Sequence, residues 1–343
     1  MIAPFEEQVP PLKYGGTELV VYNLIENLVK MGHDVTLFAT ADSQTSARLI
    51  PIYDHPLRTN PEMKLVMIRE AFRFIGAQRV MDWLVKEDFD IVHNHLGWYM
   101  LPFQHLMKTP MVTTIHGAND YFYIKVFGNY ANANFISISE NQQRTFRDVN
   151  MNFTANVYNG IDLSKFRFFP QHQDYLAYLG RMSFEKGPIL AIRAAKRTGM
   201  KLLMAAKIDP FEEEYFKKKI EPLIDGEQIK YVGEIGHEEK VELLGNAKAL
   251  IAPIQWDEPF GLYFVEAMAC GTPVISMNRG SVPEIIQHRK NGFICKNFHE
   301  MVINIKRLDR IDRRNCFERA KDFSSQKMAQ GYLEAYKKIL EGA

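Results

Sequence analysis

The sequence predicts an α/β fold made of two doubly wound halves, each a parallel sheet flanked by helices. The chain has 343 residues, which exceeds the size at which one hydrophobic core is usual. Strand-like and helix-like segments alternate from one end to the other, which is typical of parallel strands joined by crossover helices. The alternation is interrupted by a polar stretch at residues 170–174 and then restarts, so we interpret this stretch as a linker between two domains.

The first half begins with a predicted helix over residues 19–31, whose apolar positions share one face and which Gly32 ends. Those positions are Val20, Val21, Leu24, Ile25 and Leu28. Further predicted elements are a helix over 72–86 and strands over 35–39, 91–93, 111–115 and 134–139. Residues 1–4 form only a stub of the first strand. Either the edge of the sheet is short or the true start lies upstream, and we expect the second.

The second half repeats the same alternation. Strands are predicted over residues 175–180, 201–206, 229–232 and 249–253, and helices over 189–198, 211–224 and 238–246. A final helix is predicted over 325–340. Its apolar face would consist of Tyr332, Leu333, Tyr336, Ile339 and Leu340.

Composition and charge exclude several classes of function. Hydrophobic residues make up 46% and charged residues 24% of the chain, and the formal net charge is only +1, which does not favour a nucleic-acid binder. The three cysteines have no C-x-x-C spacing, which indicates a reducing compartment and no structural zinc site. No apolar run approaches the ~20 residues that span a bilayer, and no signal peptide is recognised. We therefore expect a cytoplasmic protein.

The most informative segment covers residues 257–275 and predicts a loop, a short helix, a glycine stop and a buried strand. Pro259 and Gly261 mark the loop, so the helix should begin near Gly261 with free backbone N–H groups beside Glu258. Glu266 lies further along this helix, and its side chain should point back toward the same end. Anions collect at helix N-termini, and carboxylates accept hydrogen bonds from hydroxyls. A nucleotide sugar carries both phosphates and hydroxyls.

This segment resembles the signature of the retaining glycosyltransferases of family 4, with two Glu separated by seven residues, a Phe-Gly pair and a Gly-Thr-Pro-Val strand start. The resemblance implies that Glu258 binds a hydroxyl of the transferred sugar and that Glu266 holds the ribose of the nucleoside diphosphate. It also places Phe260, Gly261 and Leu262 in the donor site. One such Glu alone would be interpreted as a solvated helix charge. The whole block favours the binding function.

The resemblance further implies the GT-B architecture, with two Rossmann-like domains and a deep cleft between them. The acceptor-binding domain is then expected over residues 1–168 and the nucleotide-sugar-binding domain over 169–324. In GT-B relatives the terminal helix crosses back onto the first domain, so residues 325–343 are assigned to that domain. The alternative is a plain capping helix on the second domain.

A Gly-Gly pair lies where the first strand gives way to the first helix, in the segment Lys13-Tyr14-Gly15-Gly16-Thr17-Glu18. Adjacent glycines let the backbone approach a phosphate without a side chain in the way. The third glycine of a dinucleotide fingerprint is missing, which argues against an NAD-dependent dehydrogenase. Family 4 enzymes carry a Gly-Gly loop here, so Gly15 and Gly16 are predicted to bind the donor. The alternative is a tight turn capped by Thr17.

The segment from Gly180 to Gly187 follows the first strand of the second half and carries Arg181 and Lys186. In relatives with the G-R-x-x-x-x-K-G pattern this pair grips the diphosphate. Charge-assisted hydrogen bonds contribute about 1.5–3 kcal/mol each, so two cations and helix-end amides can neutralise the leaving group without a metal. No Asp-x-Asp follows a predicted strand. We therefore predict a metal-independent enzyme, and the alternative for both cations is an exposed position after a strand.

His116 ends the third strand, and the carboxyl ends of strands face the ligand in open α/β sheets. The matching family histidine lies beside the transferred sugar and orients it. A lone histidine after an apolar strand is equally well explained as hydrogen-bonded structure. His93 and His95 could suggest a metal pair, but no third ligand has a fitting spacing. They are expected to line or support the acceptor side.

Three further positions are assigned through the resemblance. Relatives place the nucleotide base against the backbone at Ile235. Lys207 departs from the family, where glycine is common, and either adds a phosphate contact or fills the space. The segment Arg279–Glu284 matches a part of the family that supports the donor loop, and a structural role is expected for it.

The predicted reaction is a retaining transfer of a hexose, with glucose as the favoured sugar and UDP as the favoured nucleotide, to an acceptor hydroxyl. No carboxylate is placed as a covalent nucleophile, so the departing phosphate would deprotonate the incoming alcohol on the same face of an oxocarbenium-like sugar. No cofactor beyond the nucleotide sugar is expected. Two alternatives remain open, namely a non-catalytic nucleotide-sugar-binding module and a GT-B epimerase that acts on the donor itself.

The acceptor cannot be read from the sequence, and a small molecule, a glycan and a lipid all remain open, the last with a peripheral membrane contact. The acceptor is expected to meet loops over residues 52–64 and 119–132. Aromatic residues near these loops could stack on a sugar, although core packing is the commoner role. They are Trp98, Tyr99, Tyr121, Phe122 and Tyr123.

Overall fold

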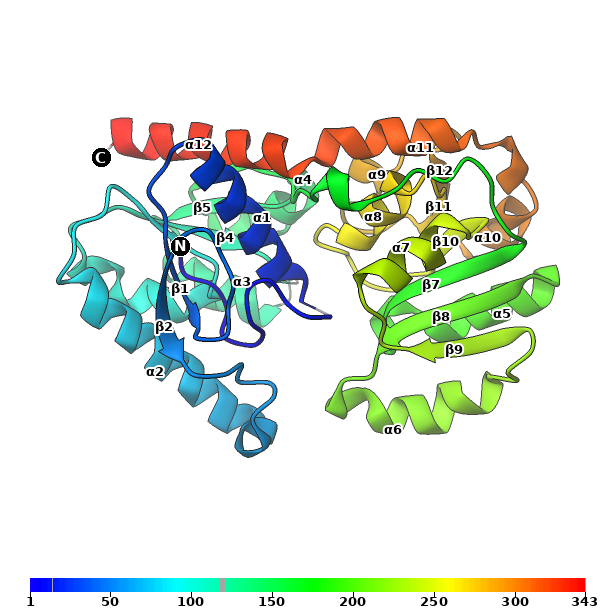
Figure 1. Ribbon diagram of the computed structural model, residues 1–343, viewed down its shortest axis with the longest axis horizontal. Coiled ribbons are helices and arrows are strands. Elements are labelled where there is room, and N and C mark those ends of the chain that lie inside the picture. The colour runs from blue at the N-terminus through cyan, green and yellow to red at the C-terminus, as the bar shows by residue number, and fades with distance from the viewer. Residues whose placement is uncertain (14, 118–120, 343) are drawn as a thin grey trace. The chain divides into compact units, whose positions relative to one another are not determined.

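A computed structural model describes residues 1–13, 15–117 and 121–342 of the chain (Figure 1). The chain divides into two compact units. Unit 1 comprises Met1–Gly160 and Ser325–Ala343, and unit 2 comprises Ile161–Ser324. The division falls before Ile161, whereas the sequence analysis drew it after residue 168, because residues 161–168 already pack in unit 2. Ile161 pairs with Ser324 in a parallel bridge, and the ring of Phe168 lies 5.3 Å from that of Phe317.

The sheet of unit 1 is parallel, and its strands form two ladders. Ile2 joins the ladders because it bridges Phe38 in one and Asn94 in the other. The first-strand stub therefore lies in the middle of the sheet and not at its edge. The order of the chain reverses at Ile2, which makes this point the topological switch point where open α/β sheets bind ligands. The strands are β1 (Thr36–Thr40), β2 (Arg48–Tyr53), β3 (Val92–Asn94), β4 (Met111–Ile115), β5 (Asn134–Ser137) and β6 (Phe153–Asn156).

The helices of unit 1 include the C-terminal helix, which packs on this unit (Figure 1). All five positions predicted for the core face of the first helix are buried. In the last helix Tyr332, Tyr336 and Ile339 are buried as predicted, whereas Leu340 in the last turn is exposed. The α-helices are α1 (Gly16–Lys30), α2 (Val66–Leu84), α3 (Tyr121–Gly128), α4 (Glu140–Thr145) and α12 (Ser325–Glu341), and 3-10 turns cover Pro61–Lys64, Gly97–Leu106 and Arg147–Val149.

Unit 2 contains one parallel six-stranded sheet in the order β12-β11-β10-β7-β8-β9. The first strand, β7, lies inside the sheet, so the order reverses between β7 and β10. The strands are β7 (Tyr175–Arg181), β8 (Lys201–Lys207), β9 (Ile229–Gly233), β10 (Ala249–Ala252), β11 (Val274–Met277) and β12 (Gly292–Cys295). The α-helices are α5 (Pro188–Thr198), α6 (Glu213–Tyr215), α7 (His237–Gly245), α8 (Leu262–Ala269), α9 (Val282–Ile285), α10 (Phe298–Ile305) and α11 (Arg313–Ala320).

Three predicted segments differ in the structure. The helix predicted over 211–224 is α6 followed by a π-helical segment, Phe216–Ile220, and a 3-10 turn, Glu221–Leu223. Pro222 has no N–H to continue the α-helical ladder, which accounts for this ending. The loop predicted over 52–64 contains the end of β2 and a 3-10 turn. Of the loop predicted over 119–132, residues 119 and 120 lie outside the described part, and the remainder begins with helix α3.

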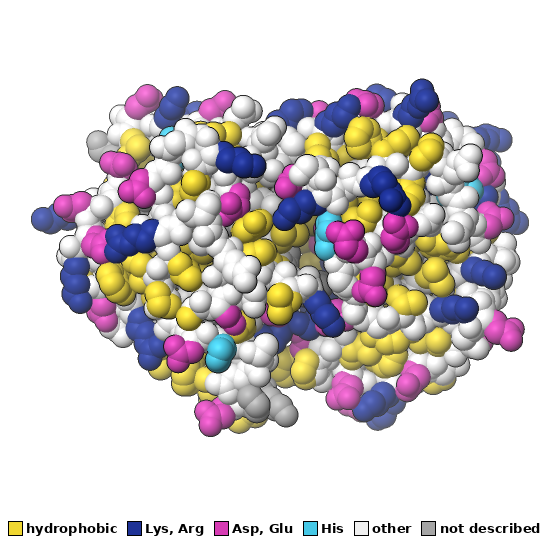
Figure 2. Space-filling model, in the orientation of Figure 1, with side chains coloured by type: hydrophobic (Ala, Val, Ile, Leu, Met, Phe, Trp, Pro, Cys, Tyr) yellow, Lys and Arg dark blue, Asp and Glu magenta, His cyan; other side chains and the backbone are white. Residues whose placement is uncertain are grey.

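Charge and membrane contact were also addressed by the sequence analysis. Figure 2 shows acidic and basic side chains interspersed over the visible face, in keeping with a formal net charge of +1. Within the described residues, no helix combines the length and the apolar character that crossing a bilayer requires. Cys270, Cys295 and Cys316 are buried free thiols, and burial raises the pKa of each.

Candidate active site

The predicted donor residues of unit 2 gather at the carboxyl edge of its sheet. Arg181 and Lys207 end the neighbouring strands β7 and β8 and pair with each other in register. The loop after β7 leads to α5 and carries Lys186, and Ile235 lies between β9 and α7. The segment between β10 and α8 then contributes Glu258, Phe260, Gly261 and Leu262, and α8 itself carries Glu266. The sheet thus presents these residues where a doubly wound fold binds ligands.

Lys186 and Glu258 form a buried ion pair, with 2.5 Å between Lys186 Nζ and Glu258 Oε2. Two aromatic donors share the same carboxylate oxygen, because Trp256 Nε1 lies 3.3 Å and the Tyr263 hydroxyl 3.1 Å from Oε2. The ammonium group also lies 4.8 Å and 5.2 Å from the centres of these two rings. None of these contacts uses Glu258 Oε1. The cluster holds one carboxylate rigidly and leaves its second oxygen for another partner.

Gly280 fixes the position of the Glu258 backbone. Its φ is +57°, and a Cβ atom at this position would lie 2.3 Å from the Glu258 carbonyl oxygen. The next residue, Ser281, donates its N–H to the same carbonyl at 2.9 Å and its hydroxyl to the Phe260 carbonyl at 2.8 Å. The segment Arg279–Glu284 therefore supports the loop, as the sequence analysis expected.

Gly187 joins the Lys186 loop to the segment that follows β10. Its φ is +71°, and a Cβ atom would lie 2.1 Å from the carbonyl oxygen of Pro253. The N–H of Gln255 donates to the Glu185 carbonyl at 2.7 Å, which links the two segments again. Lys186 and Glu258 thus come from two loops that the backbone itself holds together.

Arg181 has carboxylate partners of its own. It lies 2.6 Å from Glu185 and 3.2 Å from Glu212, and its side chain is about one-quarter exposed. Burial raises the pKa of Glu212, and its Oε2 atom has no hydrogen-bond partner. The structure therefore brings Arg181 close to Lys207 through the strand register, whereas Lys186 belongs to the neighbouring Glu258 cluster.

The remaining donor residues of unit 2 are arranged around α8. Glu266 is buried and forms an ion pair with Lys240 of α7. The N-terminus of α8 is capped by Gly261 without a side-chain hydrogen bond, so backbone N–H groups remain there for a ligand. The ring of Phe260 is buried, 5.7 Å from that of Phe323, and so belongs to the core.

Gly15 and Gly16 lie in unit 1 at the start of α1. Gly15 is the N-cap and makes no side-chain cap bond, so the alternative of a Thr17 cap is wrong. A Cβ atom at Gly15 would lie 2.6 Å from Pro11 Cβ, which explains the need for glycine. Glu18 is buried behind this turn, and burial raises its pKa to about 7. Tyr14 lies outside the described residues.

His116 belongs to a histidine network at the carboxyl edge of the sheet of unit 1. Its Nε2 lies 2.8 Å from Nδ1 of His95. The ring of His93 lies against that of His95, tilted by 41° with 3.9 Å between ring centres, and the two nitrogens of His93 contact the hydroxyls of Tyr336 and Thr114 at 2.6 and 2.7 Å. Helix α12 thereby contacts the histidine network through the Tyr336 hydroxyl. The network joins His116 to His93 and His95, a pair that the sequence analysis treated apart from it.

Burial keeps these three imidazoles neutral. It lowers the pKa of His116 to about 3 and moves the pKa values of His93 and His95 well below the usual range. The described residues contain no group of three or more His, Cys, Asp or Glu side chains arranged to hold a metal ion. The network is therefore a set of neutral donors and acceptors.

A pocket of about 180 Å³ opens beside this network within unit 1. Segments that follow Ile2, β3 and β4 line it, which places it at the switch point of the sheet. Its polar lining includes Glu6, Arg73, His95 and His116, and Trp98 contributes an aromatic wall. The pocket thus lies at the edge where the sequence analysis expected His116 to act.

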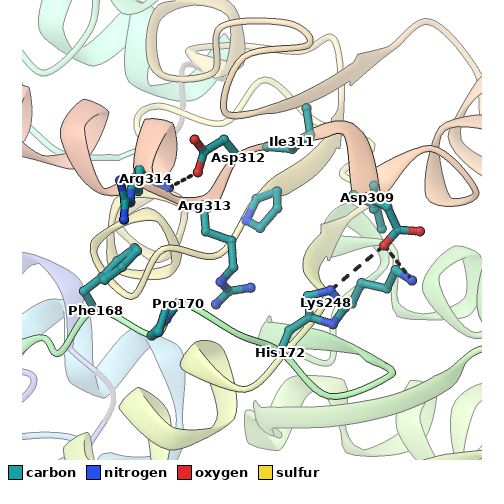
Figure 3. Close-up of a pocket in the computed structure, with 11 residues that line it drawn as sticks. Phe168, Pro170, His172, Lys248, Asp309, Ile311, Asp312, Arg313 and Arg314 are labelled. Atoms are coloured by element: carbon teal, nitrogen blue, oxygen red, sulfur yellow. Dashed lines mark hydrogen bonds and ion pairs between the residues drawn. The ribbon is translucent and has the colours of Figure 1, made fainter.

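A larger hollow of about 380 Å³ lies at the opposite, amino edge of the sheet of unit 2 (Figure 3). Its buried cation, Arg313, donates to the carbonyl oxygens of Phe169, Gly245 and Ala247 at 2.6 to 2.9 Å. Gly245 ends α7, and a cation is favourable at a helix C-terminus. Lys248 pairs with Asp309 at 3.0 Å. Because these charges are already satisfied, we assign this hollow a structural role.

Two family models match the chain. The model described as Glycosyltransferase Family 4 matches residues 14–165, and the model described as Glycosyl transferases group 1 matches residues 162–325. Together they account for nearly the whole chain. The chain belongs to the family 4 glycosyltransferases. It is therefore a glycosyltransferase enzyme, as the donor-site motifs predicted.

Similar proteins agree with this assignment. Glycogen synthase of Mycobacterium tuberculosis is 22% identical, and the alignment covers 84% of this glycosyltransferase and 80% of the relative. Sucrose-phosphate synthase from Thermosynechococcus elongatus has the same fold with a TM-score of 0.83 at 20% identity, over 100% of this chain and 98% of that chain. HepE of Anabaena, solved with UDP and glucose, has the same fold with a TM-score of 0.77 at 18% identity, over 98% of this chain and 100% of that chain. The fold is GT-B, as predicted.

The sequence analysis of this glycosyltransferase missed the residues that hold the predicted ones in place. Trp256 and Tyr263 flank Glu258 in the sequence, and their proximity to the motif was a usable signal. Lys240 and Glu212 pair with Glu266 and Arg181 across more than twenty residues, and no local pattern indicates those partners. The link between His95 and His116 joins two strand ends and was equally hidden.

Proposed function

We propose that this glycosyltransferase moves a hexose, with glucose favoured, from a nucleoside diphosphate sugar to an acceptor hydroxyl with retention at the anomeric carbon. The observation that carries the proposal is the buried Lys186–Glu258 pair at the carboxyl edge of unit 2, which sets a cation for phosphate beside a carboxylate for sugar hydroxyls. UDP-glucose is the favoured donor because HepE was solved with UDP and glucose. This donor is the only co-substrate in the proposal besides the acceptor.

The diphosphate would be bound by Arg181, Lys186 and Lys207 together with the N-terminus of α8. Carboxylates hold Arg181 and Lys186, so their guanidinium and ammonium groups are oriented. Charge-assisted hydrogen bonds to phosphate contribute about 1.5–3 kcal/mol each. Three cations and helix-end amides suffice to stabilise the leaving group, and we propose that no metal takes part.

Glu258 would bind a hydroxyl of the transferred sugar through Oε1. Lys186, Trp256 and Tyr263 all contact Oε2, so the carboxylate is held in place while Oε1 accepts from the substrate. Glu266 would accept a hydrogen bond from the ribose of the nucleotide, with Lys240 fixing its orientation. Glu258 acts here as a hydrogen-bond acceptor and not as a nucleophile.

The reaction we propose proceeds through an oxocarbenium-like sugar. The bond between the anomeric carbon and the leaving phosphate oxygen breaks, and the acceptor oxygen bonds to that carbon on the same face. The departing phosphate takes the proton of the acceptor hydroxyl. Arg181 and Lys186 stabilise the charge that develops on the phosphate, and preorganised groups of this kind usually account for most of the rate enhancement. The neutral imidazole of His116 would orient the sugar by a hydrogen bond.

The test is a mass-spectrometric screen of activated sugars for release of the nucleotide. UDP-glucose, UDP-galactose, GDP-mannose and ADP-glucose are each incubated with the wild type and with Glu258→Gln, in the presence and absence of EDTA. Slow release of UDP by the wild type, unaffected by EDTA and lost in Glu258→Gln, is expected. Release that is identical in the two proteins would contradict the role of Glu258. A changed sugar on an intact nucleotide would point to an epimerase.

A further inference from the structure

The pocket in unit 1 contains a buried nitrogen without a partner. His95 is 3% exposed, its Nδ1 contacts His116, and its Nε2 has no hydrogen-bond partner. His93 contacts the same ring but cannot serve as a partner, because both of its nitrogens are engaged by Thr114 and Tyr336. A buried polar atom without a hydrogen bond destabilises the folded protein. His95 is one of the residues that line the pocket, so a ligand atom bound there can supply the missing bond.

The hydrogen bond between His95 and His116 restricts the chemistry of that ligand atom. Both imidazoles are neutral, so each ring carries one proton. If His116 donates, then His95 Nε2 carries a proton and needs an acceptor. If His95 donates, then its Nε2 carries a lone pair and needs a donor. A hydroxyl group satisfies either case because it both donates and accepts.

The charges around the pocket disfavour an anionic ligand. Arg73 is the cation among the described lining residues, and it is already bonded to Glu6, Glu70 and the Tyr99 hydroxyl. The other oxygen of Glu6 is buried without a hydrogen bond and lies 3.6 Å from Arg69. An incoming phosphate would meet this carboxylate before it met a free cation. A hydroxyl group, by contrast, can donate to Glu6.

The size and the aromatic wall of the pocket fit a single ring. Its volume of about 180 Å³ is below the ~300–1,000 Å³ of sites for drug-sized ligands. The ring of Trp98 stacks on that of Tyr99 with 4.3 Å between centres, so a rigid flat surface borders the polar groups. The C–H face of a sugar or cyclitol packs against such a surface, while its hydroxyls point to polar neighbours.

We propose that this pocket binds the acceptor of the glycosyl transfer as a neutral, hydroxyl-bearing ring, a sugar or a cyclitol, with one hydroxyl bonded to His95 Nε2 and another to Glu6. The proposal rests on the proposed function, which leaves the acceptor open. It assigns recognition to His95, whereas the family resemblance concerns His116. It also excludes a phosphorylated ring as the group that enters this pocket.

The experiment measures the dissociation constants of ring probes for the full chain by ligand-observed NMR, with and without saturating UDP. The probes are methyl glucoside, methyl galactoside, methyl mannoside and myo-inositol, together with glucose 6-phosphate and myo-inositol 1-phosphate. At least one neutral probe should bind at least about tenfold more tightly than its phosphorylated counterpart. The variant His95→Phe keeps an aromatic ring against His93 and should weaken the binding of that probe by about tenfold, the value of one lost hydrogen bond.

Two controls separate this proposal from the donor site and from loss of folding. His105→Phe changes an exposed histidine of the same unit and should leave probe binding unchanged. Glu6→Gln should bring the affinities for neutral and phosphorylated probes closer together, which misfolding would not do. UDP affinity should stay within about twofold in all three variants, since UDP is proposed to bind unit 2.

Three results would overturn the inference. The first is equal or tighter binding of the phosphorylated probes, the second is no binding of any neutral probe, and the third is unchanged neutral binding in His95→Phe. Failure of UDP to bind the wild type would instead contradict the proposed function, and the probes measured without UDP would still test the pocket.

Discussion

The carboxyl edges of the two sheets occupy equivalent places in two similar folds, yet they are built from different chemistry. In unit 2 the edge carries charges held in ion pairs, as in Lys186–Glu258 and Lys240–Glu266. In unit 1 the edge is formed by neutral imidazoles that bond to one another and to hydroxyls, as in His95–His116. Two similar backbones therefore carry ion-paired lysines at one edge and hydrogen-bonded neutral histidines at the other.

This difference teaches how a shared fold is specialised. Ion pairs keep lysine and arginine charged and oriented, and a phosphate can replace a carboxylate as their partner with little reorganisation. A neutral histidine instead has one ring nitrogen that donates and one that accepts a hydrogen bond, and a hydroxyl group can bond to either. The strand ends fix where each side chain stands, and the residue type at each end decides which part of a nucleotide-sugar reaction the unit serves.

The largest effect is expected from removal of the cations in unit 2. Arg181→Ala and Lys186→Ala should each lower kcat by roughly 10²–10³ with a smaller change in KM, because the lost interaction stabilises charge that develops on the leaving phosphate. The measurement is the steady-state rate of UDP release from UDP-glucose. Lys217→Ala, which removes an exposed lysine paired with Glu213, should leave the rate unchanged. Full turnover in Arg181→Ala would contradict the proposal that Arg181 binds the diphosphate.

The second effect is a loss of stability in acid that is concentrated in unit 1. Histidines 93, 95 and 116 have pKa values below those of the unfolded chain, so their stability contribution is complete above pH 6.5 and is lost as the pH falls. Glu18 acts in the opposite sense, because its raised pKa of about 7 makes its contribution larger toward low pH.

Unit 1 should lose stability between pH 7 and 5.5, since three histidines and the amino terminus, whose pKa burial lowers to about 5, outweigh one carboxyl group. Unit 2 lies wholly within the described residues and contains no buried histidine, so it should lose less. Hydrogen exchange at the two pH values, corrected for intrinsic rates, measures the protection of each unit. Equal loss of protection in both units would contradict the comparison.

The sequence was sufficient for the parts of both units that carry a strong local pattern. The core face of the first helix follows from periodicity, and the helix that Gly261 caps follows from Pro, Gly and the family motif. The strand Arg48–Tyr53 was missed because Pro51 interrupts it, and α3 was missed because its run of eight residues is short and rich in aromatic side chains. In both cases packing within the folded unit decides the outcome.

The candidate site shows the same limit. Residues with a recognisable motif, such as Glu258 and Lys186, lie at the predicted edge. Their contact with each other depends on Gly187 and Gly280, where a side chain would collide with a neighbouring backbone. The bond between His95 and His116 depends on the parallel pairing of β3 with β4. Contacts between strand ends follow from topology and register, which a single sequence specifies only weakly.

A third and smaller effect is expected when the orientation of Glu258 is loosened. Tyr263→Phe removes the hydroxyl that lies 3.1 Å from Glu258 Oε2 and keeps the ring beside Lys186. Loss of one hydrogen bond to a charged group should lower kcat/KM by about tenfold. The affinity for UDP alone should not change, because UDP has no hexose to contact Glu258. A matching loss of UDP affinity would show that Tyr263 acts on the diphosphate side.

The smallest effect is expected at the nucleotide end of the same edge. Glu266→Gln keeps an oxygen that can accept a hydrogen bond from the ribose but removes the negative charge opposite Lys240. The dissociation constant of UDP, measured by calorimetry, should rise about threefold, while kcat should stay nearly constant because the ribose takes no part in bond breaking. The deoxyribose analogues of UDP provide the control, since the analogue without the contacted hydroxyl should bind both proteins equally. If kcat falls instead, Glu266 contributes to the reacting centre, which would contradict the proposal that it contacts only the ribose.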